Sequence, residues 1–354
     1  MPYVAAVVEE LKMRKEECGE VETLYIGGGT PSQLTPEALL YLFDGIQEHI
    51  TLLPTAEITL EANPDDVNPE WIETLKRTPV NRVSMGVQSL DDEILYTLHR
   101  RHTGKQALEA IHLLQDNGYH NLSIDLIYGL PHQSLEAFSS DVKAILSLDI
   151  PHLSAYALQF EQGTKLYDMR EQGEVKEVDE ELSLSCYERL MDLTAEAGLE
   201  HYEISNFAKP GYRSRHNSSY WTRKPYVGLG AGAHSYDGAR KRSSNCEDLT
   251  KYIQCIKKGK PNSEEEYLDD DTLYNELVML ALRTREGLYL PEVELVYGRE
   301  RSLYISQSAE RAIKAGWLTK KADGHLCLTR QGLFVSDDVI TDLMVQPSEQ
   351  SSKN

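Results

Sequence analysis

The segment Val21–Glu37 reads VETLYIGGGTPSQLTPE and joins two elements of regular structure. Its β-rich first part, residues 21–26, stops at three consecutive glycines. Thr35-Pro36-Glu37 then supplies an N-cap, a proline at the first helical position and an acidic residue near the positive end of the helix dipole. The segment therefore predicts a strand, a short connection and a helix.

The same alternation continues along the first half of the chain. Strands alternating with helices, with connections of a few residues, are typical of βα units around a parallel sheet. The predicted strands are rich in apolar and β-branched residues, so we expect both faces of the sheet to be covered. Further strands are predicted at 57–61, 83–87, 122–128 and 153–158, and helices are predicted to begin near Asn68, Asp91, Thr103 and Ser134.

A barrel and an open doubly wound sheet both fit this alternation, but polar residues and glycines recur where the strands end. In βα barrels the carboxyl ends of the strands form the rim that carries the active site, so we favour an α/β fold with a partial βα barrel. Residues 3–15 have the apolar spacing of a helix, although such a barrel normally opens with a strand. The residues at the strand ends are Gly27–Thr30, Glu61, Gln88, Asp125 and Gln159.

The second half predicts a different organisation. A helix at 179–198 and a short strand at 202–205 precede a cationic segment and a glycine-rich run. The acidic cluster at 264–271 marks a boundary, and three helical segments followed by a hairpin at Asp323-Gly324 give a winged-helix-like α+β pattern. The helical segments are 273–282, 290–297 and 306–315. We expect a partial barrel over 1–165, a barrel extension with a ligand-binding loop over 166–262, a winged-helix-like domain over 263–345 and a disordered tail over 346–354.

Composition limits the classes of function. Lys and Arg number 36 against 57 Asp and Glu, a net charge of −21, which argues against nucleic acid as the main partner. No apolar run approaches the roughly 20 residues of a membrane span, and no signal-peptide pattern is present, so we expect a cytoplasmic protein. Five cysteines at 18, 186, 246, 255 and 327 are too scattered for a disulfide framework or a compact metal motif.

Several of the residues at the strand ends could bind a ligand. The glycines let the backbone approach a carboxylate or a ribose, although a strained turn would explain them equally well. Glu61 could be a salt-bridge partner on the rim, Gln88 a turn cap, and Arg100 part of a solvated helix end. Asp125 lies among apolar residues, and since burying an unpartnered carboxylate is costly, a functional role is favoured there.

A second group of candidate residues lies at 213–221, which reads RSRHNSSYW. A haem needs an axial ligand, flat apolar cover and cations for its propionates. His216 could be the ligand, and Tyr220 and Trp221 could cover the porphyrin. A loop that only packs its aromatic residues on the barrel is the alternative. The cations available to the propionates are Arg213, Arg215, Arg223 and Lys224.

These motifs, in this order, resemble radical S-adenosylmethionine proteins of the oxygen-independent coproporphyrinogen III oxidase type. The resemblance covers nearly the whole chain, and HNSSYW at 216–221 with GLGAGAHSY at 228–236 is similar to the haem chaperone branch of that family. The motifs shared with the wider family are LYIGGGTPS at 24–32, EANPDD at 61–66, SMGVQSL at 84–90, the Arg100 segment and DLIYGLP at 125–131.

The resemblance implies S-adenosylmethionine and haem as ligands. Gly27, Gly28 and Gly29, with Thr30, would face the methionine end of S-adenosylmethionine. Asp125 would meet the ribose, Arg100 the carboxylate, and Ile127 the adenine, while Glu61 and Gln88 complete the set. His216 would bind the haem iron, with Arg215, Tyr220 and Trp221 around it.

The chain departs from the family pattern at its start. The family places a CxxxCxxC loop for a [4Fe-4S] cluster after its first strand, and no such triplet is present. We interpret this as a start codon placed too far downstream or as a truncated form. Such a chain is expected to hold no cluster, to bind S-adenosylmethionine weakly without cleaving it, and to leave a barrel edge unpaired at 21–26.

The leading hypothesis is a haem chaperone that passes haem to an acceptor protein, on a radical S-adenosylmethionine scaffold. The alternative is an enzyme, the oxygen-independent coproporphyrinogen III oxidase of porphyrin biosynthesis, which would not need HNSSYW. A DNA-binding winged helix is disfavoured by the acidic charge. The expected partners are haem and an unidentified acceptor, with membrane-surface contact only through that acceptor.

Overall fold

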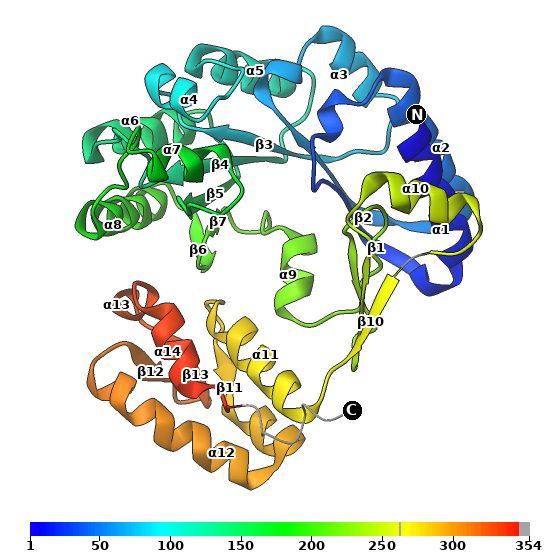
Figure 1. The fold of residues 1–354 in the computed structure, drawn as a ribbon. Coiled ribbons are helices and arrows are strands. Elements are labelled where there is room, and N and C mark those ends of the chain that lie inside the picture. Colours follow the sequence, from blue (N-terminus) through cyan, green and yellow to red (C-terminus); the bar gives the residue numbers. More distant parts are fainter. Residues whose placement is uncertain (262, 347–354) are drawn as a thin grey trace. The chain divides into compact units, whose positions relative to one another are not determined.

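The computed structural model describes residues 1–261 and 263–346 (Figure 1). The chain forms two compact units. We call Glu20–His201 with Ser205–His216 the barrel unit, and Met1–Gly19, Tyr202–Ile204 and Asn217–Asn354 the second unit. The four-part division drawn from the sequence stays a prediction.

The barrel unit is built on a curled sheet that forms part of a barrel, with helices along its outer side (Figure 1). The predicted α/β partial barrel is therefore confirmed. β1 to β5 are parallel neighbours in chain order, and β7 joins β5 antiparallel. The strand order is β1 (Glu20–Ile26), β2 (Thr51–Ala62), β3 (Arg82–Gln88), β4 (Leu122–Tyr128), β5 (His152–Ala157), β7 (Asn206–Ala208) and β6 (Glu200–Glu203).

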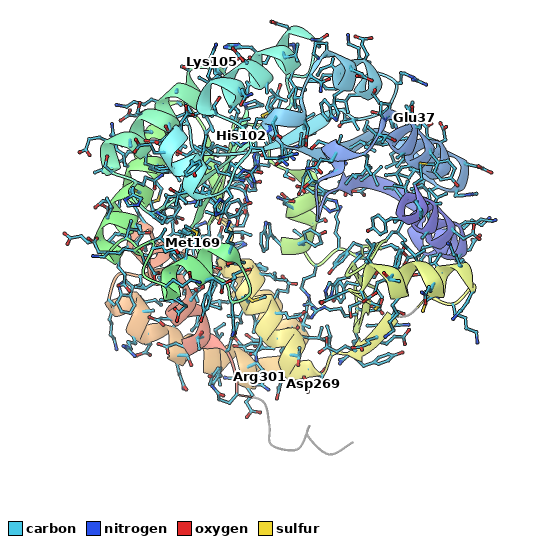
Figure 2. The ribbon with its side chains drawn as sticks, turned by 45° about the horizontal axis from the view of Figure 1, so that its top comes forward. Glu37, His102, Lys105, Met169, Asp269 and Arg301 are labelled. Atoms are coloured by element: carbon cyan, nitrogen blue, oxygen red, sulfur yellow. The ribbon has the colours of Figure 1, made fainter. Side chains whose placement is uncertain are left out.

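Side-chain caps begin the helices of this unit where the sequence predicts, except for the helix at Lys165–Glu171, which was not predicted. Thr35 accepts a hydrogen bond from the Ala38 amide, and Thr103 forms a capping box with Gln106. Lys105 and Glu37 lie on the outer surface, whereas His102 is buried (Figure 2). The helices are α2 (Pro36–His49), α3 (Pro69–Leu75), α4 (Asp92–Thr97), α5 (Gly104–Asp116), α6 (Leu135–Leu146), α7 (Lys165–Glu171) and α8 (Glu180–Glu196).

Two details of the sheet differ from the sequence-based expectation. β2 begins at Thr51 rather than at residue 57, because Glu20 and Val21 pair with Thr51 and Leu52. The apolar side chains of the strands also lie mostly on the outward face, because successive side chains point to opposite faces, although many of the inward side chains are buried as well. The outward side chains are fully buried and include Leu60, Val83, Met85, Val87, Ile124 and Leu126, whereas the inward positions are largely polar.

In the second unit, α1 (Pro2–Cys18) is anchored by a buried carboxylate. Glu10 is fully buried and accepts hydrogen bonds from the Gly230 amide, the Asn245 side chain and the Tyr252 hydroxyl. These contacts join α1 to the glycine-rich run, to β9 (Lys241–Asn245) and to α10 (Leu249–Lys257). These hydrogen bonds offset the free-energy cost of removing the Glu10 carboxylate from water.

The acidic cluster at 264–271 does more than mark a boundary. Residues 264–266 lie in β10 (Ser263–Tyr267), which pairs antiparallel with β9, and β8 (His234–Tyr236) completes a three-stranded sheet. Glu265 and Glu266 form ion pairs with Lys241 and Arg242 of the facing strand. Opposite charges across the pair therefore stabilise a strand that the sequence analysis missed.

The C-terminal part of the second unit is a winged-helix-like domain, as predicted. β11, β12 and β13 form a three-stranded sheet whose hairpin turns at Asp323-Gly324. The two predicted helices at 290–297 and 306–315 run on as α12, with a break at Gly298, where φ is 83°. Its elements are α11 (Asp270–Leu282), β11 (Leu288–Tyr289), α12 (Leu290–Lys314), β12 (Leu318–Lys320), β13 (His325–Leu328), α13 (Arg330–Leu333) and α14 (Ser336–Leu343).

Within the described ranges, 1–261 and 263–346, the helices are too short or too polar to cross a membrane.

Candidate functional site

The inner face of the barrel sheet brings polar side chains into rows across neighbouring strands. Tyr25 of β1 is in register with Thr59 of β2, which pairs with Arg82 of β3. Asp125 of β4 pairs with Gly86 on one side and with Ser154 on the other. Register partners in parallel strands share a face, so these residues all lie on the inner surface.

Glu61 is the centre of the first part of the candidate site. Its carboxylate accepts a hydrogen bond of 2.7 Å from the Tyr25 hydroxyl and one of 3.2 Å from the Gly28 amide. Gly27 passes so close to this group that an added Cβ would lie 2.5 Å from Glu61 Cδ and 2.6 Å from Tyr25 Cε1. Gly28 has φ of 78°, a conformation that glycine adopts without strain. The glycines and Glu61 therefore form one structural group.

Gln88 and Arg100 meet at the end of β3. Gln88 takes a left-handed backbone conformation, with φ of 69°, at an irregularity between Gly86 and Gln88 in the pairing of β3 with β4. The Arg100 guanidinium donates to the Gly86 carbonyl at 2.9 Å and to the Asn63 side chain at 2.8 Å. Its Nε is buried without a protein partner. Strained backbone and an unsatisfied buried donor are typical of ligand-binding sites.

The acidic pair Asp65 and Asp66, which follows Glu61, has a structural role in this geometry. Asp66, in the short helix η2 (Pro64–Asp66), accepts a hydrogen bond of 2.6 Å from Ser32 of η1 (Pro31–Gln33). Arg101 forms ion pairs with both Asp65 and Asp66. These contacts join the connections that follow β1 and β2, and so they hold Glu61 and the glycines in place.

Asp125 is a carboxyl group in a poorly hydrated environment. Its pKa is raised to about 7, chiefly because the group is buried; the Ser154 hydroxyl, the Arg82 guanidinium and the Ser84 hydroxyl lower this pKa, and the nearby Glu61 carboxylate raises it. The Ser84 hydroxyl is 3.5 Å from Asp125 Oδ2. A carboxyl group with its pKa near neutrality can accept or give up a proton at physiological pH.

Thr30 follows β1, and Ile127 lies near the end of β4. Thr30 begins η1, and its carbonyl accepts a hydrogen bond from the Gln33 amide. The Ile127 carbonyl accepts one from the Gln133 side chain. Neither contact joins these residues to Glu61 or Asp125, so their proposed part in binding depends on their place at the ends of β1 and β4.

The residues at this edge fit S-adenosylmethionine chemically. The nucleoside and amino-acid ends of that molecule require carboxylate acceptors, a guanidinium and exposed backbone amides. Glu61, Asp125 and Arg100 supply the side chains, and the open space around Gly28 and Gly29 leaves room for close approach. The donor Nε of Arg100 supports the fit most directly.

The described residues do not provide a set of ligands for a [4Fe-4S] cluster. In the ranges 1–261 and 263–346, no group of three His, Cys, Asp or Glu side chains is placed to hold a metal ion. The cysteines at 18, 186, 246, 255 and 327 are free thiols.

The segment at 213–221 is partly helical, and the expectation of a loop is wrong at Arg215–Trp221, which forms α9. The buried Glu57 carboxylate of β2 accepts hydrogen bonds of 3.0 Å from the amides of Arg215 and His216. An anion at this position satisfies the first N–H groups of the helix. Glu57 therefore explains why the helix starts here.

His216 lies against β1 within the barrel unit. Its Nδ1 is 2.9 Å from the Thr23 hydroxyl, and its ring stacks on Tyr25, with ring centres 5.0 Å apart and planes at 25°. Burial lowers the pKa of His216, Glu57 raises it and Arg82 lowers it again, with a net decrease. The imidazole is consequently neutral at pH 7, which is the form that binds iron.

The aromatic residues of the motif belong to the second unit and have partners there. Tyr220 packs edge-on against Tyr226, with ring centres 4.9 Å apart. The guanidinium of Arg283 lies 5.4 Å above the centre of the Trp221 ring. Such an arginine stacks favourably on an aromatic face, and it is a second-unit residue that the sequence analysis did not single out.

The cations expected to meet propionates already have protein contacts. Arg215 donates to the Thr55 carbonyl, and Arg213 forms an ion pair of 3.0 Å with Glu200. Arg223 lies 3.3 Å from the Tyr236 hydroxyl and 3.5 Å from that of Tyr297. Propionate binding by Arg213, Arg215 or Arg223 would therefore compete with these contacts, and for Lys224 it stays a prediction.

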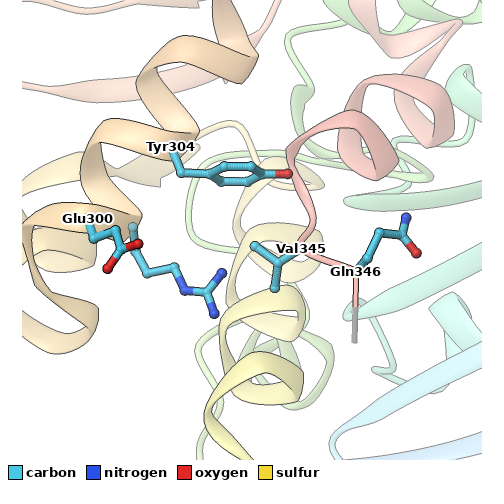
Figure 3. A pocket seen from close by; sticks show the side chains of 5 residues that line it. Glu300, Tyr304, Val345 and Gln346 are labelled. Carbon is cyan, nitrogen blue, oxygen red and sulfur yellow. The ribbon is translucent and has the colours of Figure 1, made fainter. Parts of the chain in front are cut away.

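A shallow hollow lies elsewhere, in the winged-helix-like domain (Figure 3). Glu300, Arg301 and Tyr304 of α12 line it together with Val345 and Gln346. Arg301 also forms an ion pair with Asp271. None of the predicted site residues contributes to this hollow.

The sequence analysis missed several inner-face residues, among them Thr23, Tyr25, Glu57 and Arg82. They belong to the same alternation as residues that were found, since Glu57 precedes Glu61 by four positions and Tyr25 precedes Gly27 by two. Successive even spacings in a strand place side chains on one face. This even spacing could have identified the missed residues from the sequence.

The curled sheet with helices along its outer side is a partial barrel of the type found in radical S-adenosylmethionine proteins. The family model for the radical SAM superfamily matches residues 2–145, and that for the HemN C-terminal domain matches 268–335. The structure of coproporphyrinogen III oxidase (HemN) from Escherichia coli matches with a TM-score of 0.82 over 97% of this chain and 82% of that chain. At 20% identity, this match shows the fold alone.

More similar sequences define the branch. The heme chaperone HemW of Lactococcus lactis is 36% identical over 292 residues, 82% of this chain and 76% of that protein. The heme chaperone HemW of Bacillus subtilis is 34% identical, covering 95% of this chain and 89% of that protein, and that of Escherichia coli is 35% identical, covering 86% and 79%. The chain belongs to the heme chaperone HemW family.

Proposed function

We propose that this protein is a haem chaperone that binds haem through His216 and passes it to an acceptor protein. The observation that carries the proposal is the state of His216 within the barrel unit. It is neutral, its Nδ1 is engaged by Thr23, and its ring is held against Tyr25. Since the bond at one ring nitrogen fixes which nitrogen meets a metal, Nε2 is the proposed iron ligand.

S-adenosylmethionine is the proposed second ligand, and when bound it supplies a nucleoside and a sulfonium-bearing amino acid at the carboxyl edge of the sheet. Asp125 accepts the ribose hydroxyls, Arg100 pairs with the carboxylate, and Glu61 receives the amino group. Gly27, Gly28 and Gly29 let the backbone approach this group closely. The same proposal includes the predicted contacts of Thr30, Gln88 and Ile127 with S-adenosylmethionine.

Binding of the nucleoside should depend on pH through Asp125. Below pH 7 the carboxyl is largely protonated, because burial raises its pKa to about 7, and a protonated carboxyl accepts fewer hydrogen bonds from the ribose. Raising the pH from 6 to 8 should thus increase the affinity for S-adenosylmethionine by about tenfold. Titration calorimetry at pH 6, 7 and 8 measures this change.

Two variants test whether Asp125 is the titrating group. Asp125→Asn cannot ionise, so its affinity should be the same at pH 6 and pH 8. Asp116→Asn makes the same change at an exposed position on α5 and should keep the tenfold rise. A rise of equal size in Asp125→Asn would assign the pH dependence to another group.

The proposed function is tested by comparing haem with iron-free coproporphyrin III. A haem carrier that uses an iron–imidazole bond should bind haem at least about tenfold more tightly than the metal-free macrocycle, since one such bond contributes more than 1.4 kcal/mol. Absorption and fluorescence titrations of the full chain give both affinities. Equal or tighter binding of coproporphyrin III would favour the alternative, the coproporphyrinogen III oxidase, which acts on a metal-free porphyrinogen.

The proposal specifies the acceptor only as a protein that takes up haem. The proposed location is the cytoplasm, whose reducing conditions suit five free thiols. The winged-helix-like domain is proposed to contact a protein partner rather than DNA, because the chain carries a net charge of −21.

A further inference from the structure

Tyr25 of β1 contacts both of the proposed ligand sites of the barrel unit. Its hydroxyl donates a hydrogen bond of 2.7 Å to Glu61 Oε1, at the edge proposed to bind S-adenosylmethionine. Its ring stacks on the imidazole of His216, the proposed haem ligand, at 5.0 Å between ring centres. One phenol ring therefore contacts both functional side chains.

We propose that Tyr25 is a positioning residue that couples occupancy of the Glu61 site to the presentation of the His216 imidazole. The inference rests on the proposed function, because it assumes that Glu61 meets S-adenosylmethionine and that His216 meets iron. It goes beyond that function by predicting that the two ligands affect each other's affinity. Such an effect is reciprocal, since linkage requires each ligand to change the affinity of the other by the same factor.

The Glu61 end of the link is held by two donors. The carboxylate accepts from Tyr25 at one oxygen and from the Gly28 amide at the other. A cationic amino group placed against Glu61 adds a third, charged partner, and a charge-assisted bond is stronger than the bond to a neutral phenol. The Glu61 carboxylate then settles in one position, and the Tyr25 hydroxyl that donates to it settles with it.

The His216 end of the link is equally constrained. The backbone amide of His216 donates to Glu57, and Nδ1 is hydrogen bonded to Thr23, so the main chain and one ring nitrogen are fixed. The imidazole stacks on the Tyr25 ring at 25°, so its tilt depends on the position of that ring. When the Tyr25 ring no longer moves, the tilt of the imidazole is set before haem arrives.

The direction of the coupling follows from this order of events. Ordering a ligand before binding lowers the conformational entropy that binding must offset. S-adenosylmethionine should therefore strengthen haem binding, by about fivefold, at the lower end of measured coupling between sites. The same reasoning predicts that haem strengthens the binding of S-adenosylmethionine equally.

Tyr25→Phe is the decisive variant, because it removes the hydroxyl that contacts Glu61 and keeps the ring that contacts His216. Haem affinity is measured by absorption titration with and without saturating S-adenosylmethionine, whose own binding is measured by calorimetry. The wild type should gain about fivefold in haem affinity and Tyr25→Phe should gain none. Tyr41→Phe, the same change at an exposed position on α2, should keep the full gain.

Tyr25→Leu separates stacking from hydrogen bonding. Loss of the stacked ring should lower haem affinity by up to about tenfold even without S-adenosylmethionine, and should change the Soret band that reports iron ligation. Tyr25→Phe should keep the wild-type Soret band. A purely structural role of Tyr25 would instead make both variants lose stability without this difference in the spectrum.

A readout without haem keeps the inference testable if the proposed function fails. In haem-free protein, the ¹⁵N resonances of the His216 ring should shift when S-adenosylmethionine is added to the wild type, and should not shift in Tyr25→Phe. If haem binds nowhere but this difference is seen, the haem assignment fails and the coupling stands. Equal responses of the wild type and Tyr25→Phe, no response in either, or no binding of S-adenosylmethionine to the wild type would overturn the coupling.

Discussion

Gly27→Ala should weaken the binding of S-adenosylmethionine by about 12-fold to 140-fold, which corresponds to the loss of a charge-assisted hydrogen bond of about 1.5–3 kcal/mol. A Cβ at this position would lie 2.5 Å from Glu61 Cδ, 2.6 Å from Glu61 Oε1 and 2.6 Å from Tyr25 Cε1. Real Cβ atoms do not approach other atoms so closely, so Glu61 or Tyr25 has to move. Titration calorimetry at pH 8, where Asp125 is ionised, measures the loss.

The neighbouring glycine provides the comparison. An added Cβ on Gly29 meets nothing within 4 Å, so Gly29→Ala makes the same chemical change in open space. Its loss of affinity should be at least about tenfold smaller than that of Gly27→Ala, the difference that 1.4 kcal/mol makes. Equal losses in both variants would mean that the backbone freedom of the whole glycine run matters, and that the contact with Glu61 does not.

The sheet of the barrel unit could be predicted from the sequence because its signals are local. Caps such as Thr35, Thr103 and Ser134 lie beside the helices they begin, and β-branched runs lie between them. The start of β2 could not be placed in this way. Residues 51–56 become a strand through pairing with Glu20 and Val21, and pairing partners 31 residues apart leave no mark in a local pattern.

The residues of the candidate site likewise differ in whether the local sequence identifies them. Glu61 and Asp125 could be found because a carboxylate among strand residues is unusual, and the glycines because they interrupt a strand. Tyr25 has no such mark, since tyrosine is common in strands. Its role depends on Glu61 from β2 and on His216, 191 positions along the chain, and only the folded structure brings these side chains together.

The helical conformation of Arg215–Trp221 illustrates a third case. Its sequence, RHNSSYW, contains residues of low helix propensity and no acidic residue for its first turn. The missing anion is Glu57, which caps the helix from a distant strand. The expectation of a loop was wrong because the cap that stabilises this helix is tertiary rather than local.

His216→Ala should lower haem affinity by about a hundredfold or more. Removing a partner of a metal ligand already costs 10–100-fold in metal affinity, and removing the ligand itself should cost at least as much. The variant should fold, because Glu57 accepts its hydrogen bonds from the backbone amides of residues 215 and 216, which alanine retains. An absorption titration of the wild type and the variant gives both affinities and the Soret band.

Three further measurements distinguish iron ligation by His216 from packing of α9. His112→Ala removes an exposed histidine on α5 and should leave haem affinity unchanged. Free imidazole added to His216→Ala should restore the wild-type Soret band, because it can occupy the space of the lost ring and bind the iron, whereas it cannot repair lost packing. Thr23→Val should lower the affinity by a smaller factor, about tenfold, since it removes only the partner of Nδ1. If haem affinity and the Soret band are the same in the wild type and in His216→Ala, His216 is not the ligand, and its contacts with Thr23 and Tyr25 serve only to fasten α9 to the sheet.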